Sequence, residues 1–596
     1  MKRLLLLLLT YGYFSNATAQ VLPPELPWSG ASEKYMRAAN HPWVTPAEKS
    51  GLTETPDYQT TINWLQKLAD SSPLLSMQPI GKSGQNRDLW LVAAAKPHIQ
   101  KPEQLQKSDK ATLLFHAGIH SGEIDGKDAG MMFLRDLVLE DSSVLDKINI
   151  LFIPVLNPDG HENSSQFARV NQRGPVEMGW RTNARNLNLN RDYSKAETPE
   201  IQALLKVFQK WAVDLYIDIH VTDGIDYQYD ITWGSTSKFP YSPNIDAWLK
   251  KELYPELQKA LRKQGHVPGP LIFARDNKNP ETSLVEWSPM ARFSNGYGDS
   301  RHLPTILIEN HSLKNYKQRV LGTYVFLQAV ADRLAKDGKS LQNATMQDRS
   351  ARPKKINLPP NWSADFSKII PDTLDYLGVA YKKYQSPISG TEEVQWLGKP
   401  KNARVPIFSQ APEIQIELPK AYWVPASRSD IIEKLQLHGI KMEIVQKPTN
   451  VAAQFYRLEK YKVSGSAYEG RVRLAIDEMK IEEHEATFAP GSARITTDQA
   501  LADLLVLLLE PRSDDSFIQW GYFHEILQPT EYIEAYVIEP LAQKMLKENP
   551  ELRKEFEQAL QDEKFAKNPR ARLYWFYKRS PYYDKSYLLY PVGREM

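Results

Sequence analysis

The sequence contains no cysteine among its 596 residues. It therefore cannot form a disulfide, offer a thiolate to a metal ion or use a thiol as a nucleophile. It also lacks a long block of lysine and arginine, and its formal net charge is only +2. These absences exclude the basic surface by which proteins bind nucleic acids or anionic membranes. We expect a globular protein without a nucleic acid partner, whose stability comes from hydrophobic cores.

Apolar runs long enough to span a membrane are missing after the N-terminal segment. Residues 1–19 have the layout of a secretory signal peptide, with a short positive region, an apolar stretch from Leu4 to Phe14 and small residues up to Ala19. We expect cleavage before Gln20 and export of the mature chain; the alternatives are a buried N-terminal helix and a membrane anchor. Because secreted eukaryotic proteins of this size usually contain cysteine, the sequence favours a bacterial periplasmic or extracellular location.

The chain is too long for one hydrophobic core, and its patterns predict several parts. Residues 20–340 alternate short apolar runs with helical patterns, which predicts an α/β domain with a mixed sheet flanked by helices. Residues 341–364 are polar and basic, as expected of a linker. Residues 365–495 contain short alternating runs that predict a smaller β-rich domain, and residues 496–596 form a mainly helical segment.

Five apolar segments of the first domain are predicted strands because they are rich in Leu, Ile, Val, Phe or Tyr. They are residues 88–94, 111–116, 148–155, 214–219 and 305–309. In open α/β sheets, functional side chains collect at the carboxyl ends of the strands. Candidate functional residues are therefore expected at these ends.

Directly after the second of these strands, His120 and Glu123 stand three positions apart in a strand-to-helix loop, so both can face one cation. An imidazole and a carboxylate suit zinc, which takes three protein ligands in catalytic sites and keeps a fourth position for water. Such a pair arises by chance about once in a chain of this composition, so a third ligand is needed. His220, at the end of another predicted strand, provides it.

Glu309 ends the last predicted strand, where a carboxylate is unexpected unless it meets solvent or a metal. Beside a metal-activated water, a glutamate can accept a proton and return it to a leaving amine. Glu309 is therefore a candidate general base. The other interpretation is a helix-capping or salt-bridged glutamate.

Further polar motifs lie between the candidate metal ligands. An Asn-Pro-Asp-Gly motif begins at Asn157, an arginine stands at Arg181, and an Asn-Arg pair stands at Asn190 and Arg191. Together with the His-x-x-Glu motif, the strand-end histidine and the strand-end glutamate, this ordered set resembles the zinc carboxypeptidase family. The resemblance covers about residues 50–325.

The resemblance implies one zinc ion per chain, bound by His120, Glu123 and His220, with Glu309 as general base and acid. It implies a metallocarboxypeptidase that hydrolyses the C-terminal bond of peptides with a free terminal carboxylate. Zinc-activated water is the nucleophile in this reaction.

The resemblance also implies roles in substrate binding. Arg181 polarises the scissile carbonyl and stabilises the oxyanion, and Asn190 and Arg191 hold the terminal carboxylate. These roles suit a guanidinium, whose rigid fork matches a carboxylate and whose fixed charge stabilises developing negative charge. Tyr297 is the candidate for the mobile active-site tyrosine of the family.

Two positions depart from the family pattern. The usual aspartate two residues before the Asn-Arg pair is Asn188, so a contact that raises the basicity of a metal ligand must be weaker or supplied elsewhere. Gly122 stands where pancreatic members carry an arginine, which removes a substrate contact.

Two other interpretations fit the same motifs. The substrate could instead be a peptidoglycan stem peptide or an acyl-amino acid, because related folds hydrolyse amides outside proteins. The chain could also be a secreted binding protein that keeps a carboxylate-recognising cleft without catalysis. The complete set of candidate ligands and the presence of Glu309 favour an enzyme.

Overall fold

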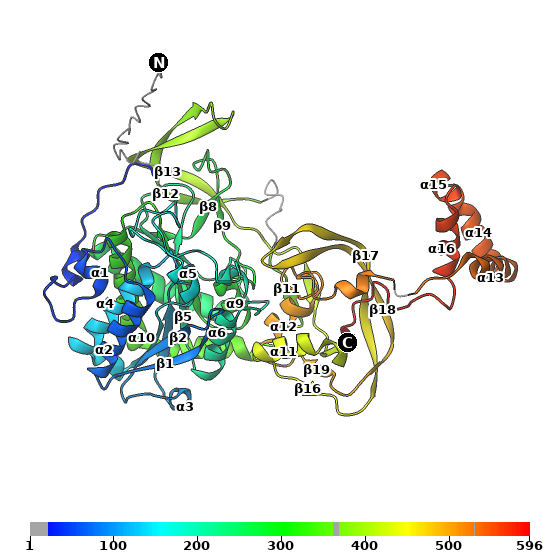
Figure 1. Cartoon of the computed structure of the whole chain (residues 1–596), viewed down its shortest axis with the longest axis horizontal. Coiled ribbons are helices and arrows are strands. Elements are labelled where there is room, and N and C mark those ends of the chain that lie inside the picture. Colours follow the sequence, from blue (N-terminus) through cyan, green and yellow to red (C-terminus); the bar gives the residue numbers. More distant parts are fainter. Residues whose placement is uncertain (1–21, 361–368, 530) are drawn as a thin grey trace, which may run out of the picture. The chain divides into compact units, whose positions relative to one another are not determined.

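The computed structural model describes residues 22–360, 369–529 and 531–596 (Figure 1). The predicted signal peptide, residues 1–19, lies outside the described residues. None of the helices in the described part is both long and apolar enough to cross a bilayer.

The described residues form two compact units. The first runs to residue 351 and takes in residues 359–413, and the second contains residues 352–358 and 414–596. These units do not coincide with the predicted boundaries. The predicted linker begins inside helix α10 (Tyr316–Ser350), and the predicted β-rich domain is divided because its first hairpin joins a sheet of the first unit.

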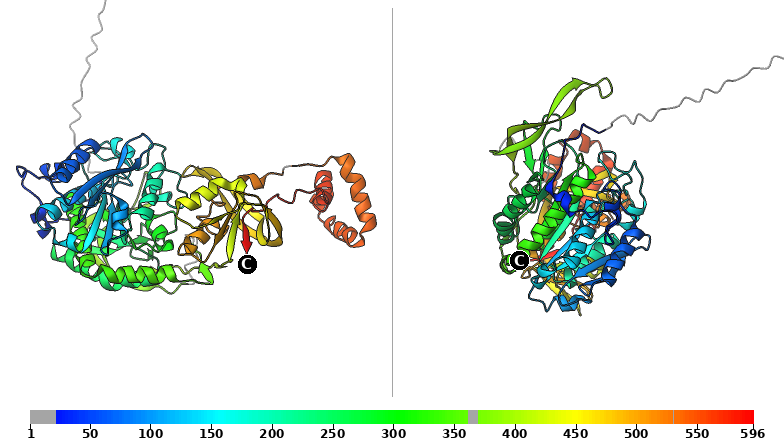
Figure 2. Two further views of the ribbon diagram at one scale, coloured as in Figure 1. Left: turned by 90° about the horizontal axis from the view of Figure 1, so that it is seen from below. Right: turned by 90° about the vertical axis from the view of Figure 1, so that its left-hand side faces the viewer.

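An eight-stranded mixed sheet lies in the first unit (Figure 2). The central strands β4, β3, β5 and β10 are parallel neighbours, whereas β2 and β6 pair with this group in antiparallel fashion. The predicted α/β fold with a mixed sheet is confirmed, and the five predicted strands are β2, β3, β4, β5 and β10. In order across the sheet, the strands are β1 (Leu75–Lys82), β2 (Asp88–Ala94), β4 (Ile148–Ile153), β3 (Ala111–His116), β5 (Leu215–Thr222), β10 (Thr305–His311), β6 (Ile231–Gly234) and β7 (Pro268–Pro270).

Helices pack on this sheet through apolar side chains. Helix α4 is buried over most of its length, and α10 packs against both α4 and the sheet. A fully buried ion pair between Arg319 of α10 and Asp125 of α4, at 2.9 Å, fixes the start of α4 two residues after Glu123. The helices of the first unit are α1 (Pro46–Lys49), α2 (Tyr58–Asp70), α3 (Pro102–Leu105), α4 (Asp125–Leu139), α5 (Pro158–Glu162), α6 (Pro199–Lys210), α7 (Pro243–Trp248), α8 (Tyr254–Lys263), α9 (Ser294–Ser300) and α10.

A second sheet of the first unit joins segments that are far apart in the sequence. The long hairpin of β12 (Asp372–Gln385) and β13 (Glu392–Phe408) pairs with β9 (Leu284–Glu286), which pairs with β8 (Ile272–Ala274). Figure 1 labels these four strands in one region of the unit. The pairing of β13 with β9 explains why the hairpin belongs to the first unit and not to a separate β-rich domain.

The second unit contains the remainder of the predicted β-rich region, from residue 414, and the helical C-terminal segment. A six-stranded sheet has the order β16 (Glu443–Ile444), β19 (Ala493–Thr496), β15 (Ala421–Val424), β20 (Gly593–Glu595), β17 (Thr449–Tyr468) and β18 (Arg471–Phe488), and β11 (Lys355–Asn357) pairs with β14 (Gln415–Glu417). The last helices share a small aromatic core of their own. The helices are α11 (Ser429–Leu437), α12 (Ala502–Leu509), α13 (Ala535–Glu548), α14 (Pro550–Ala559), α15 (Glu563–Ala566) and α16 (Pro569–Tyr577).

Candidate active site

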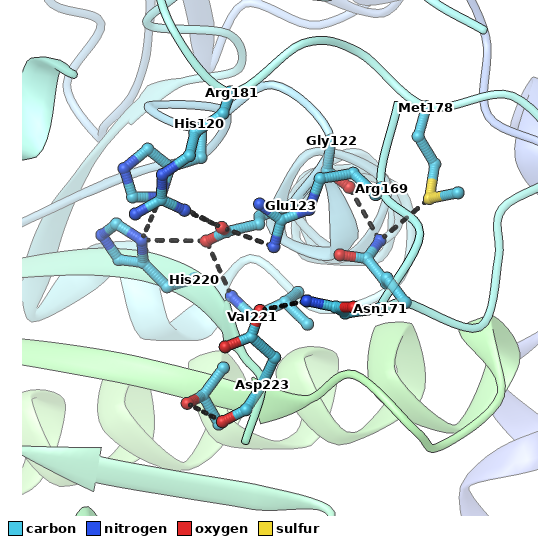
Figure 3. Close-up of polar contacts among 12 residues, drawn as sticks. His120, Gly122, Glu123, Arg169, Asn171, Met178, Arg181, His220, Val221 and Asp223 are labelled. Carbon is cyan, nitrogen blue, oxygen red and sulfur yellow. Dashed lines mark hydrogen bonds and ion pairs between the residues drawn. The ribbon is translucent and has the colours of Figure 1, made fainter. Parts of the chain in front are cut away.

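His120, Glu123 and His220 meet at the carboxyl ends of β3 and β5 (Figure 3). Nδ1 of His120 is 3.1 Å from Oε1 of Glu123 and 3.2 Å from Nδ1 of His220. Nδ1 of His220 is in turn 3.0 Å from Oε2 of Glu123. All three side chains are buried, and their potential ligand atoms lie within 4.8 Å of one another. The structure thus brings the three predicted ligands together.

Each histidine is oriented by a contact at its other ring nitrogen. Nε2 of His120 is 2.8 Å from Oδ1 of Asn188, and Nε2 of His220 is 2.8 Å from Oδ2 of Asp218. Because amide and carboxylate oxygens accept hydrogen bonds, these contacts direct both Nε2 atoms away from Glu123 and both Nδ1 atoms towards it. Two imidazoles and one carboxylate in this arrangement are a donor set used by catalytic zinc sites, so the residues fit the ion.

Two arginines and a backbone amide surround the carboxylate of Glu123. Oε1 lies 2.8 Å from Nη2 of Arg169 and 3.0 Å from Nη1 of Arg181, and Oε2 accepts a hydrogen bond from the backbone of Val221 at 3.0 Å. Burial raises the pKa of this carboxyl, but His120 and Arg169 more than offset burial and lower the pKa well below its usual value. The carboxylate is therefore ionised, as a metal ligand must be.

The two imidazoles differ in their affinity for a proton. Burial lowers the pKa of His120 to about 4, which keeps this ring neutral. Burial also lowers the pKa of His220, but the carboxylate of Asp218 outweighs it and raises the pKa to about 10. A metal ion that binds His220 therefore has to displace a proton.

Glu309 lies beside His220 because β10 and β5 are parallel neighbours with these two residues in register. Its Oε2 atom is buried and finds no hydrogen-bond partner among the described residues. Burial raises the pKa of Glu309 to about 8, against the opposing effect of His220. A carboxyl group with this pKa can both accept and donate a proton near neutral pH.

A cavity of about 290 Å³ opens beside these groups. Its polar lining includes the candidate ligands, Glu309 and four further side chains, Arg169, Arg181, Asn190 and Arg191. Its apolar lining includes Phe273, Trp287, Phe293 and Leu307. The cavity therefore combines positive charge with a mainly aromatic wall.

The predicted substrate-binding pair, Asn190 and Arg191, lines this cavity. The side chain of Asn190 is engaged within the protein, because its Oδ1 accepts a hydrogen bond from the backbone of Ser294 at 3.0 Å and its Nδ2 is 3.2 Å from Nε2 of His220. Arg191 donates to the backbone oxygen of Asn190 at 2.7 Å, and its guanidinium lies 4.3 Å from the centre of the Phe293 ring.

Tyr297 does not reach the cavity. Helix α9 directs its side chain into the core, where it is 0% exposed. Its hydroxyl accepts a hydrogen bond from Nη1 of Arg301 at 3.1 Å, and its ring packs against Tyr193. The prediction that Tyr297 contacts the substrate is therefore corrected: in this structure it is a core residue.

The sequence patterns missed two charged residues of the site. Asp218 stands two positions before His220, so both side chains lie on the same face of β5, and this spacing was a usable signal. Asp218 also lies 3.1 Å from Nε2 of His116, so it joins two histidines. Arg169 comes from an irregular segment without a motif, and only the folded chain shows that it reaches Glu123.

The following known proteins are similar to this chain. Residues 61–269 match the sequence profile described as zinc carboxypeptidase. Carboxypeptidase 2 of Trichophyton tonsurans is 21% identical over 536 residues, which cover 86% of this chain and 93% of the relative. Carboxypeptidase D of Rattus norvegicus is 27% identical over 186 residues, which cover 29% of this chain and 12% of that protein. The crystal structure of carboxypeptidase A from Helicoverpa armigera has a TM-score of 0.35 at 16% identity and covers 48% of this chain and 74% of its own.

The matched segment contains all three side chains of the His-Glu-His cluster. Over this segment the chain is similar to the zinc carboxypeptidase family, and this similarity supports a metallopeptidase of the carboxypeptidase type.

Proposed function

We propose that the chain removes C-terminal residues from peptides, with one zinc ion bound by His120, Glu123 and His220. The observation that carries this proposal is the meeting of these three side chains beside a cavity that also contains Glu309 and three arginines. Zinc bound there supplies Lewis acidity, which activates a water molecule and polarises a carbonyl group.

Glu309 acts as general base and then as general acid. Its carboxylate accepts a proton from the attacking water, and its carboxyl form gives that proton to the leaving amine. The raised pKa, about 8, favours the second step, because the group retains a proton near neutral pH until the amine departs. The unengaged Oε2 atom is available for this transfer.

Arg181 and Arg191 bind the two negative centres of the substrate. Arg181 is 41% exposed at its side chain and lies next to Glu123, where it can stabilise charge that develops on the scissile carbonyl oxygen. Arg191 pairs with the terminal carboxylate through its planar fork. Asn190 contacts His220 and the backbone of Ser294, and it therefore positions both groups beside Arg191. A free terminal carboxylate is therefore a requirement for cleavage.

We also propose that the chain is exported, because residues 1–19 have the layout of a signal peptide. In a bacterial host, protein recovered from the periplasm or medium is expected to begin at Gln20. An unprocessed N-terminus in a membrane fraction would contradict this proposal.

A mixed peptide pool tests the proposed reaction. Half of the peptides carry free C-termini and half carry amides, and the pool is incubated with the zinc-loaded chain and followed by mass spectrometry. We expect stepwise loss of terminal residues from the free acids only. Glu309→Gln should lower the rate by at least about 100-fold with unchanged zinc content, whereas Glu459→Gln, at an exposed glutamate of the second unit, should not.

Equal trimming of the amides would contradict the role of Arg191. No trimming of either half would contradict peptide hydrolysis, and peptidoglycan fragments and acyl-amino acids would then be the substrates to test. Full activity of Glu309→Gln would remove Glu309 from the mechanism.

A further inference from the structure

Strands β8 and β9 have two apolar faces, because successive side chains of a strand point to opposite sides. On one side, Phe273 and Trp287 cluster with Leu307 and line the cavity of the active site. On the other side, Ile272 and Leu284 enter a separate cluster. One small sheet therefore lies between the apolar wall of the cavity, which includes Phe273 and Trp287, and the second cluster, which includes Ile272 and Leu284.

The hairpin β12–β13 contributes to that second cluster. Tyr376 and Val405, which are 1% and 0% exposed, pack with Ile272 and Leu284. The backbone of β13 continues the sheet, since Ile407 pairs with Leu284. The hairpin thus covers the side of β8 and β9 that faces away from the cavity.

Polar contacts fix the same junction at several points. Oγ of Ser409 donates a hydrogen bond to Glu286 at 2.5 Å, at the end of β9. Lys401 of the hairpin forms an ion pair with Glu281 at 2.7 Å, and Lys278 forms one with Glu393 at 3.1 Å. These contacts restrict sliding of β9 relative to the hairpin, and Trp287 follows β9 directly.

Arg191, which we propose binds the terminal carboxylate of the substrate, lies next to the apolar wall of the cavity. Its guanidinium lies against the ring of Phe293, which is itself part of the apolar lining. A carboxylate paired with Arg191 therefore lies at the edge of the wall. Because the carboxylate and the side chain of a terminal residue share one Cα atom, that side chain has to enter the same part of the cavity.

Three carboxylates occur among the described residues of the cavity lining, and none of them belongs to the apolar wall of Phe273, Trp287, Phe293 and Leu307. These carboxylates are those of Glu123, Glu309 and Asp223. The first two have roles in the proposed reaction. Asp223 is exposed and accepts a hydrogen bond from Nδ2 of Asn171 at 3.1 Å.

We propose that the terminal residue of the substrate carries an aromatic or large aliphatic side chain, which packs against Phe273, Trp287 and Leu307, and that the hairpin β12–β13 fixes this wall. The proposal rests on the proposed function, since it concerns the same cavity. Phe273 and Trp287 are specificity residues that touch the substrate, whereas Val405 and Ser409 are positioning residues that act through β9.

Peptides that differ only in their last residue test the substrate class. With the zinc-loaded full chain, kcat/KM for terminal Phe and Leu should exceed that for terminal Lys and Glu on the order of 10- to 100-fold. Equal rates, or faster release of Lys or Glu, would overturn the apolar pocket while leaving the carboxypeptidase reaction intact. Failure to cleave any of the peptides would instead overturn the proposed function.

Substitutions test the wall and the hairpin separately. Phe273→Ala should lower the ratio of kcat/KM for terminal Phe over terminal Ala by about 10-fold. Val405→Ala, in the hairpin core, should raise KM for terminal Phe several-fold with little change in kcat. Ile388→Ala, at a side chain 94% exposed in the hairpin turn, is the matched control and should change neither.

A second positioning variant keeps the test decisive if Val405→Ala does not fold. Ser409→Ala removes the hydrogen bond to Glu286 without opening the core, and it should raise KM for terminal Phe in the same direction. The thermal unfolding temperature reports whether each variant is folded. If folded Val405→Ala and Ser409→Ala proteins keep the wild-type KM for terminal Phe, the hairpin has no part in specificity.

Discussion

His120 donates a hydrogen bond from Nε2 to Oδ1 of Asn188 at 2.8 Å. The contact orients the ring as a carboxylate would, but a neutral amide does less to raise the basicity of the imidazole. The negative charge lies instead at the other histidine, where Asp218 is 2.8 Å from Nε2 of His220. The two histidines that we propose as ligands therefore have one neutral partner and one charged partner.

Asn188→Asp should strengthen zinc binding by about 10-fold, because a carboxylate raises the basicity of the attached imidazole more than an amide does. Competition with a chelator measures this affinity without reference to activity. Asn450→Asp adds the same charge at an exposed position of the second unit and is the control. Unchanged affinity in Asn188→Asp would show that His120 does not depend on this partner.

Asp218→Asn should weaken zinc binding by about 10- to 100-fold, because His220 loses the charged partner that orients and polarises it. The same substitution leaves His116 without its carboxylate contact, so the unfolding temperature has to be measured as well. A variant that is folded and binds zinc as tightly as the wild type would contradict the assigned role of Asp218.

Gly122→Ala should destabilise the fold by about 1–3 kcal/mol, because a Cβ atom at this position would lie 2.4 Å from Cγ of Arg169 and 2.6 Å from the backbone oxygen of Gly179. Thermal or denaturant unfolding measures the change. Gly465→Ala is the matched control, since a Cβ there meets no atom within 4 Å. Equal stability of the two variants would mean that Arg169 moves aside at little cost.

His311 provides a test of pH dependence. Burial and the nearby cation of Lys314 lower its pKa to about 4, against the opposing effect of Asp226. Between the unfolded pKa of 6.5 and about 4, the unfolded chain therefore binds a proton that the folded chain does not. Its contribution to stability is complete above pH 6.5 and is lost as the pH falls towards 4.

His311→Gln should therefore flatten the loss of stability with acidification, by up to about 1.4 kcal/mol per pH unit in this window. Denaturant unfolding at a series of pH values measures the slope. His484→Gln, at an exposed histidine of the second unit, is the control. An identical slope in His311→Gln and the wild type would contradict the buried, neutral state of His311.

The sequence was sufficient to predict what depends on local pattern. Apolar runs identified the central strands, and the positions of His120, His220 and Glu309 at strand ends predicted that they lie at one edge of a sheet. That prediction needed only the rule that the carboxyl ends of parallel strands lie together. The three candidate ligands accordingly lie close together in the structure.

The remaining features depend on contacts between distant segments. No local pattern indicates that β13 pairs with β9, because both strands have the same alternation whichever edge they join. Tyr297 was misplaced for a related reason, since its motif does not show towards which side α9 directs the ring. Arg169 was missed because its neighbours do not reveal that it folds over Gly122.

Two features of this protein can change independently in evolution. One is the relative position of Glu309 and His220, which the pairing of β5 with β10 fixes, and the other is the apolar lining of the cavity. Backbone hydrogen bonds between these strands place Glu309 beside His220 whatever lies between them in the sequence. The intervening segment carries Phe273, Trp287 and Phe293. Insertions or replacements there can produce descendants with new substrate preferences, while the distance between Glu309, the proposed proton-transferring group, and His220, a proposed metal ligand, stays the same.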